Sequence, residues 1–186
     1  MQVSDTVSKL ISALLEVGET KTFDRITVKE ITERADIHRK TFYYYYSDKY
    51  ELLRDAYVVN ALKYWDRDQL TLVNWERQTG EVLKAIKEHY RFYENSIHWD
   101  GGLWHRMTVD RIGYVINKTL NQFEPDTKGD ARFSNLFISG GIMEVMNTWI
   151  GHGCQTEISI LLSSFKQMIA DFMDIIPRLT NTIRFE

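Results

Sequence analysis

Cysteine, proline and glycine are all scarce in this chain of 186 residues, which holds 1, 2 and 10 of them respectively. The single cysteine, Cys154, cannot form a disulfide within the chain, so nothing suggests an oxidising compartment. Proline and glycine are the residues that most disfavour a helix interior, so their scarcity allows long helices. With 44% hydrophobic and 26% charged residues, the chain can bury a core. We therefore expect an all-α protein.

Long hydrophobic runs are also missing. No apolar stretch reaches the length that spans a membrane, and Asp5 and Lys9 interrupt the N-terminal segment where a signal peptide would have its apolar core. We expect a cytoplasmic protein with no membrane partner.

Motifs for catalysis and metal binding are absent as well. The chain has no nucleophile elbow, no phosphate-cradling glycine loop and no paired metal motif. His98 and His105 are seven residues apart with no third ligand at a recognised spacing. We expect no catalytic residues, no cofactor, no metal site and no enzymatic activity.

What the sequence does contain is a clear helix start at Thr27. The Thr27 hydroxyl can accept from the backbone N–H of Glu30, whose carboxylate can reach back to Thr27. Val28, Ile31 and Ala35 then recur at helical spacing and would face a core. The pattern predicts a short helix that begins at about Val28.

A second short helix follows almost at once. Asp36 and Ile37 leave room only for a tight turn, after which residues 38–44 can form a helix. Asp48 and Glu51 repeat the capping signature for a third helix. Two short helices joined in this way are a helix-turn-helix, whose second helix can enter the major groove of DNA.

The residue types and spacing of this segment resemble a known family, the TetR/AcrR-type transcriptional regulators. The matching positions are Ile26, Thr27, Val28, Ile31, Ala35, Ile37, Arg39, Thr41, Phe42, Tyr43, Tyr46 and Lys49. The resemblance implies a three-helix DNA-binding head, residues 1–48, and a helical body for effector binding and dimerisation, residues 49–186. It implies about nine helices in all.

The same resemblance implies which residues meet DNA. Thr27 and Lys29 would touch phosphate at the start of one helix, and Tyr45 and Lys49 would flank the recognition helix for phosphate. Arg39 is the best candidate for a base edge, because its fork can bond both acceptors of guanine. The full candidate set is Thr27, Lys29, Arg39, Lys40, Thr41, Tyr43, Tyr44, Tyr45 and Lys49. Phe42 and Tyr46 are assigned to the core.

Two features weaken this interpretation. Between residues 21 and 49 there are seven basic and five acidic residues, and the net charge of the whole chain is −3. Asp36 stands where the family usually has glycine, and His38 stands where it usually has serine or threonine. Aspartate tolerates the left-handed conformation, so the turn can still form.

Helical periodicity extends through the rest of the chain. The expected helices outside the motif cover about residues 3–17, capped by Ser4 or Asp5 and ended by Gly18, then a helix from Asp48, then 75–95, 103–123, 131–152 and 156–179. Asn74 is the expected cap of the helix at 75. Residues 124–130 form the clearest loop.

The last two helices carry more apolar residues than their neighbours can cover. We infer that they pair with the same two helices of a second subunit, as the resemblance also implies. The expected interface residues are Gly140, Gly141, Trp149, Leu161, Phe165, Ile169 and Phe172. A dimer of this kind would bind a palindromic operator.

Aromatic and polar residues of the body could line a pocket for a small-molecule effector. The candidates are Trp65, His89, Tyr93, Trp104, Met107, Tyr114 and Met143. Ordinary core packing is the competing interpretation for each. Glu144 and Asn147 could be polar groups of the pocket or of the interface.

The leading functional hypothesis is a homodimeric DNA-binding regulator, a repressor released from double-stranded DNA by an unknown small molecule. The alternative is an adaptor of the same fold that binds another protein and no DNA, which the weak basic charge and Asp36 would favour.

Overall fold

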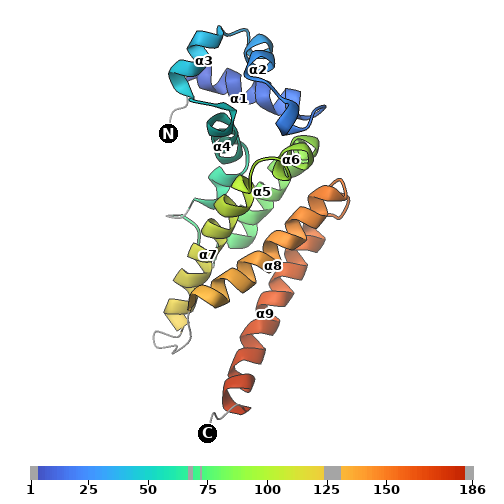
Figure 1. Ribbon diagram of the computed structural model, residues 1–186. Coiled ribbons are helices and arrows are strands. Elements are labelled where there is room, and N and C mark those ends of the chain that lie inside the picture. The colour runs from blue at the N-terminus through green and yellow to red at the C-terminus, as the bar shows by residue number, and fades with distance from the viewer. Residues whose placement is uncertain (1–3, 67–68, 72, 124–130, 183–186) are drawn as a thin grey trace.

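The computed structural model describes residues 4–66, 69–71, 73–123 and 131–182, with side chains described except at 115–123, 131–135, 169 and 172–182. The described part is helical and contains no strand, which confirms the all-α prediction (Figure 1). Its helices are α1 (Asp5–Gly18), α2 (Val28–Ala35), α3 (Arg39–Tyr45), α4 (Lys49–Asn60), α5 (Trp75–Glu88), α6 (Tyr90–Ile97), α7 (Leu103–Phe123), α8 (Ala131–Gly151) and α9 (Ile158–Thr182), with 3-10 turns η1 (Phe23–Arg25) and η2 (Leu62–Trp65).

The first helices of the head begin where their capping residues predict. Ser4 accepts from the Val7 backbone N–H at the start of α1. At α2 the capping box is complete, with Thr27 and Glu30 bonded in both directions. The apolar faces of these helices meet in a small core that includes Leu10, Leu14, Phe23, Ile31 and Phe42. Local signals and burial therefore agree throughout the head.

The turn between α2 and α3 depends on Asp36. Its φ and ψ are 53° and 49°, the left-handed conformation in which aspartate is tolerated. The next residue closes the turn, since the Ile37 N–H donates to the Thr32 carbonyl at 2.9 Å. His38 occupies the N-cap of α3 without a capping bond from its side chain. The turn survives the absence of glycine, as expected.

Helix α4 leads from the head into the body. Asp48 caps it by accepting from Tyr50 and Glu51 N–H, while Glu51 itself reaches back to Ser47 rather than to Asp48. The helix packs on α1 in the head and on η2 in the body. The division of the chain at residues 48 and 49 stays a prediction.

The helix expected over residues 75–95 is in fact two helices. The chain breaks at His89, whose φ and ψ are −119° and 34° and whose N–H bonds the Ile86 carbonyl, three residues back. Asn74 precedes α5 without capping it, because its side chain bonds Thr71 N–H and the Gln69 carbonyl. The break lets α6 pack against α1 and α4, and no local breaker residue announces it.

Gly18 was expected to be the C-cap of α1, and the cap lies one residue later, at Glu19. Gly18 is the last helical residue, and the Glu19 cap has ordinary right-handed dihedrals, with φ −68°. A Cβ at Gly18 would lie 2.5 Å from Phe92 Cδ2 of α6. The glycine is therefore needed for the close approach of α1 and α6.

The remaining helices agree with their predicted ranges. Helix α7 matches at both ends, and α8 and α9 differ by one to three residues. The loop predicted at 124–130 lies outside the described residues. Helix α8 packs on α7 and α9 packs on α5, and α9 extends beyond the other helices toward the C-terminus (Figure 1). No helix in the described part of the chain combines the length and apolarity needed to cross a bilayer.

A buried polar cluster joins α4 to α6 and α7. Asp100 accepts from the N–H groups of Gly102, Leu103 and Trp104 at 2.8 to 3.0 Å, which caps α7. The Tyr57 hydroxyl of α4 donates to the same carboxylate at 3.1 Å and lies 2.9 Å from Ser96 Oγ. Burial and the nearby carboxylate raise the pKa of Tyr57. The cluster fixes α4 to the body through groups that are almost fully buried.

Candidate nucleic-acid interface

The recognition helix α3 presents aromatic rings to solvent. Tyr43, Tyr44 and Tyr45 are 47%, 82% and 40% exposed, whereas Phe42 and Tyr46 are buried. The core assignment of Phe42 and Tyr46 is thus confirmed. The Tyr46 hydroxyl donates to Asp55 Oδ2 of α4, and burial raises its pKa. Consecutive helical residues point in different directions, so three of the four tyrosines remain outward.

Arg39 lies along this outward face. Its Nη2 donates to the Tyr43 hydroxyl, one turn on, at 3.1 Å. Its guanidinium carbon also lies 5.5 Å from the centroid of the Tyr43 ring. The pair holds the arginine fork at the surface of α3, where both acceptors of a guanine could be reached.

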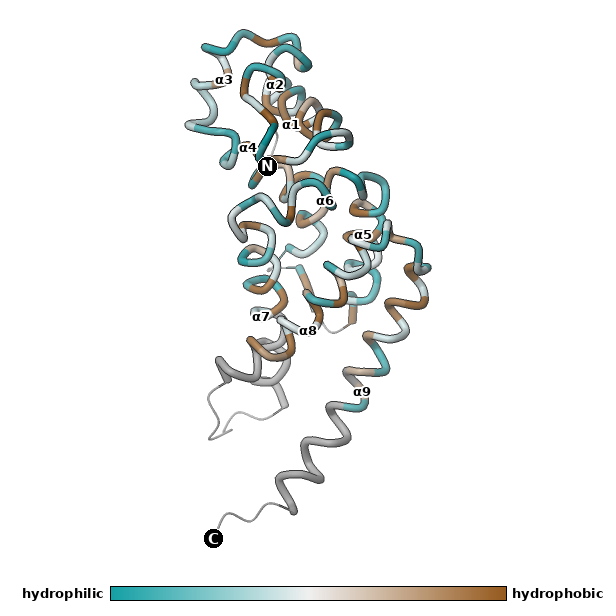
Figure 2. Tube along the Cα trace, turned by 45° about the vertical axis from the view of Figure 1, so that its right-hand side comes forward, coloured by the Kyte–Doolittle hydropathy of each residue, from teal (hydrophilic) through white to brown (hydrophobic). Residues whose placement is uncertain are grey.

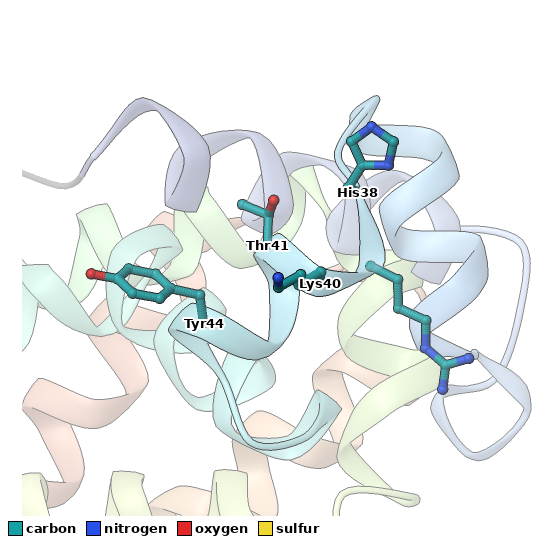
Figure 3. Close-up of a pocket in the computed structure, with 5 residues that line it drawn as sticks. His38, Lys40, Thr41 and Tyr44 are labelled. Atoms are coloured by element: carbon teal, nitrogen blue, oxygen red, sulfur yellow. The ribbon is translucent and has the colours of Figure 1, made fainter.

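A shallow open hollow runs beside the first turns of α3. It is lined by His38, Arg39, Lys40, Thr41 and Tyr44 (Figure 3). Four of these were predicted from the sequence, and His38, which stands where the family usually has serine or threonine, was not. Its ring is turned outward, since it makes no capping bond.

The groups at the start of α2 are bonded to one another and do not form an open site for phosphate. The Thr27 hydroxyl donates to Glu30 Oε2 at 2.7 Å, and Lys21 Nζ lies 2.5 Å from Glu30 Oε1. The Lys21 and Thr27 bonds lower the pKa of Glu30 to about 2. Lys29 is exposed on α2, and its Nζ lies 3.6 Å from Glu33 Oε1. Thr27 therefore serves as a cap in the structure.

Lys49 has an environment that its sequence position does not suggest. Its Nζ donates to the carbonyls of Phe23, Asp24 and Ile26 at 2.7, 2.9 and 2.8 Å. The ammonium group also lies 4.6 Å from the centroid of the Phe23 ring. Burial lowers the pKa of Lys49. The side chain turns toward η1, so its ammonium group is occupied by backbone carbonyls.

The predicted pocket residues are only partly brought together. Tyr93 and Trp104 pack in one buried aromatic cluster with Tyr57, with ring centroids 5.1 to 5.8 Å apart. Trp65 donates through Nε1 to Thr79, at a different place in the body. The others are scattered: Met143 is buried on α8, Met107 is partly buried and Tyr114 is exposed on α7, and His89 pairs with Glu19 of α1 at 3.3 Å.

The predicted interface residues fall into three groups. Gly140 and Gly141 have no described atom within 4 Å of an added Cβ. Trp149, Leu161 and Phe165 are buried within the chain's own core, and Trp149 Nε1 donates to the Thr156 carbonyl. This burial takes them off the surface that a second copy could reach. Ile169 and Phe172 lie outside the residues with described side chains.

Other apolar residues of α8 and α9 are exposed and were missed. They are Leu136, Phe137, Val145 and Ile160. Helix α8 is apolar on nearly every side, so periodicity alone could not separate its inner face from its outer face. The neighbouring helices decide which side of α8 is covered and which side is exposed.

Comparison with known families matches most of the chain in two segments. Residues 10–56 match the family described as "Bacterial regulatory proteins, tetR family". Residues 73–171 match the family described as "Transcriptional regulator C-terminal region".

Two curated relatives are regulators by name. YxbF of Bacillus subtilis, an uncharacterised HTH-type transcriptional regulator, is 32% identical over 109 residues, which are 53% of this chain and 27% of the relative. The chain therefore spans little more than a quarter of that protein. DhaS of Lactococcus lactis, the dhaKLM operon transcriptional activator, is 24% identical over 137 residues, 73% of this chain and 71% of the relative.

Two solved structures share the fold. The dihydroxyacetone kinase operon activator DhaS superposes with a TM-score of 0.70 at 18% identity, over 92% of this chain and 97% of that one. The fatty acid degradation regulator FadR of Bacillus halodurans superposes with a TM-score of 0.63 at 14% identity, over 90% and 96%.

Proposed function

Since the chain belongs to the TetR family of transcriptional regulators, we propose that it is a homodimer that binds a palindromic operator through α3 of each copy. The outward face of α3 carries the proposal. Arg39 is held there by Tyr43, and Tyr44 and Lys40 stand beside it on a helix whose other side is anchored by Phe42 and Tyr46. A rigid helix with an arginine fork and aromatic rings suits a major groove.

The charge of this face is modest but concentrated. Arg39 and Lys40 are both exposed on α3, and Lys29 is exposed at the start of α2. Phosphate contact requires a basic face and not a basic protein. Two copies would present these groups twice, about 34–36 Å apart if they occupy successive major grooves.

Exposed apolar residues support the dimer. Leu136 and Val145 of α8 and Ile160 of α9 are exposed, and Gly140 and Gly141 leave space for the backbone of another helix. Large exposed apolar side chains are candidates for burial at a protein–protein interface. Packing of these helices against their copies would cover them and would set the separation of the two heads.

Two buried polar atoms in the body support an effector. Trp104 Nε1 and Asn147 Oδ1 have no hydrogen-bond partner within the described part of the chain. A buried polar group without a partner costs about 1–3 kcal/mol. A small molecule that offers an acceptor to Trp104 would remove that cost, and binding would favour one orientation of the heads over another.

The sign of regulation has two candidates. The family resemblance favours repression released by the effector. The curated relative DhaS is named an activator, which favours activation. A reporter gene behind the recovered operator, measured with and without the chain in the same cells, separates them by the direction of the change.

Fragment selection tests the central proposal. Purified protein is mixed with fragments of its source genome at two salt concentrations, in parallel with Tyr43→Ala and with Trp99→Ala, an exposed aromatic of the body that serves as the control. We expect a palindrome that the wild type and Trp99→Ala retain and Tyr43→Ala loses, with affinity that falls steeply with salt. Folded dimers that enrich nothing at low salt would instead support the protein-binding adaptor.

Replacement of Trp104 tests the effector. Trp104→Phe keeps an aromatic ring in the cluster and removes only the N–H donor. Compounds related to the products of the regulated genes are titrated onto the operator complex. We expect the variant to bind the operator normally and to need more effector for the same response. An unchanged response would exclude Trp104 as an effector contact.

A further inference from the structure

Lys49 joins the two segments that flank the helix-turn-helix along the chain. It is the first residue of α4, directly after the recognition helix and its turn. The carbonyls that it binds belong to residues 23 to 26, directly before the Thr27 cap of α2. One side chain thus connects the end of the helix-turn-helix to its beginning.

All three N–H donors of the Lys49 ammonium group have an acceptor. An ammonium group has three N–H donors, and Lys49 Nζ has three carbonyl oxygens at 2.7 to 2.9 Å. The Phe23 and Tyr50 rings lie 4.6 and 5.8 Å from the same nitrogen. No proton is left to donate to a phosphate unless a carbonyl is released.

We propose that Lys49 is a positioning residue for DNA binding, a clamp that fixes the start of α2 relative to α3 and does not itself contact phosphate. This inference rests on the proposed function, because it assigns a role within the same site. Lys49 holds residues 23–26, which lead directly into α2 with Thr27 and Lys29. Helix α3, which precedes Lys49 in the chain, carries Arg39. If the clamp is lost, these groups are no longer fixed before binding, so the same contacts to the duplex form only at the cost of ordering them.

The salt dependence of operator binding separates a clamp from a phosphate contact. Removal of a lysine that contacts phosphate lowers the slope of log affinity against log salt by roughly 0.9 per contact, about 1.8 for two copies. Removal of a clamp lowers affinity and leaves the slope unchanged. We expect Lys49→Met to bind the recovered operator about tenfold more weakly, because hydrogen bonds to a charged group are lost, with the wild-type slope. A slope reduced by the phosphate amount would overturn the proposal.

Lys49→Arg gives a second, independent comparison. It keeps the positive charge, but a planar guanidinium cannot bring one nitrogen to three converging carbonyls. We expect it to lose affinity as Lys49→Met does. Full wild-type affinity in Lys49→Arg would instead show that charge alone is needed. Lys40→Met serves as the exposed comparison on α3, and Lys84→Met, on α5 away from the head, as the matched control.

Amide hydrogen exchange tests the clamp without DNA. The N–H groups of Arg25, Ile26 and Ile31 donate to the carbonyls of Thr22, Phe23 and Thr27, within and on either side of the segment held by Lys49. We expect their exchange to accelerate in Lys49→Met while amides of α5 stay protected, which also shows that the variant is folded. Unchanged exchange would contradict the clamp. If the wild type bound no DNA, the proposed function would fail while this result still decided whether the clamp exists.

Discussion

Glu30, at the start of α2, takes part in both a helix cap and an ion pair. Its carboxylate completes the capping box with Thr27 and pairs with Lys21. Both partners favour the ionised form, which is why the pKa of Glu30 falls to about 2. The same carboxylate occupies the Thr27 hydroxyl and the Lys21 ammonium group, so these groups stabilise the start of α2 instead of being free for phosphate.

The lowered pKa of Glu30 predicts a pH dependence of stability. A depressed pKa adds stability above the unfolded value of 4.5, and that stability is lost as pH falls toward about 2. The group is partly exposed, so we expect the effect to be below about 1 kcal/mol. Urea midpoints of wild type and Glu30→Gln should differ most at pH 6 and less at pH 3, and should converge only near pH 2 or below. A difference that stays constant across this range would exclude Glu30 as the source.

Gly18 predicts a steric effect at the scale of a single residue. In Gly18→Ala the new methyl group would meet the buried Phe92 ring at 2.5 Å, so the ring or the helix must shift. Overpacking of this kind costs about 1–3 kcal/mol. Gly113→Ala is the control, because no described atom lies within 4 Å of its added Cβ. Equal urea midpoints for the two variants would show that the approach of α1 and α6 is not tight.

At the scale of elements, α4 is the connection between recognition and the body. It is held by Tyr57, which donates to Asp100, and by Asn60, whose Oδ1 accepts from the Tyr93 hydroxyl at 2.7 Å. Asp100 in turn caps α7. A change in the orientation of α6 or α7 therefore acts directly on the helix that follows the recognition helix.

Substitution of Tyr57 tests this connection. Tyr57→Phe keeps the ring in its aromatic cluster and removes one bond to a buried carboxylate. We expect a loss of about 1–3 kcal/mol in the free energy of unfolding, because Asp100 loses a charged hydrogen bond. We also expect the effector to change operator affinity less in this variant. A stability loss with an unaltered effector response would assign Tyr57 a structural role alone.

The sequence predicted elements better than it predicted contacts between them. Capping residues such as Ser4, Thr27 and Asp48 act on neighbours a few positions away, so their helices could be placed. The break at His89 depends on how α6 packs against α1, and the bonds of Lys49 join residues more than twenty positions apart. Trp149 and Phe165 looked like interface residues because periodicity identifies an apolar face without saying which helix covers it.

At the scale of the whole molecule, α8 and α9 carry the exposed apolar residues that the proposed dimer would cover. Figure 2 shows hydrophobic residues distributed along the described parts of both helices. Gly141 of α8 is also exposed, and no described atom lies within 4 Å of a Cβ added there.

Gly141→Leu distinguishes a close helix contact from an open surface. In a monomer the substitution would be neutral or stabilising, because glycine in a helix interior costs about 0.5–1 kcal/mol relative to alanine. In a dimer with closely approaching helices it would separate them and weaken association. We expect sedimentation equilibrium to show a higher dimer dissociation constant for the variant. Tighter or equal association would place the interface elsewhere.

The junction of head and body has a consequence for engineering. The head is attached through α4 and also through α6, where Gly18 and Glu19 contact Phe92, Asn95 and His89. A transplanted head from another regulator would have to bring a glycine at the end of its first helix and a partner for His89. A chimera exchanged at residue 48 alone would combine α1 of one protein with α6 of another, and this contact would not match. The exchanged segment should therefore include α6 together with the head.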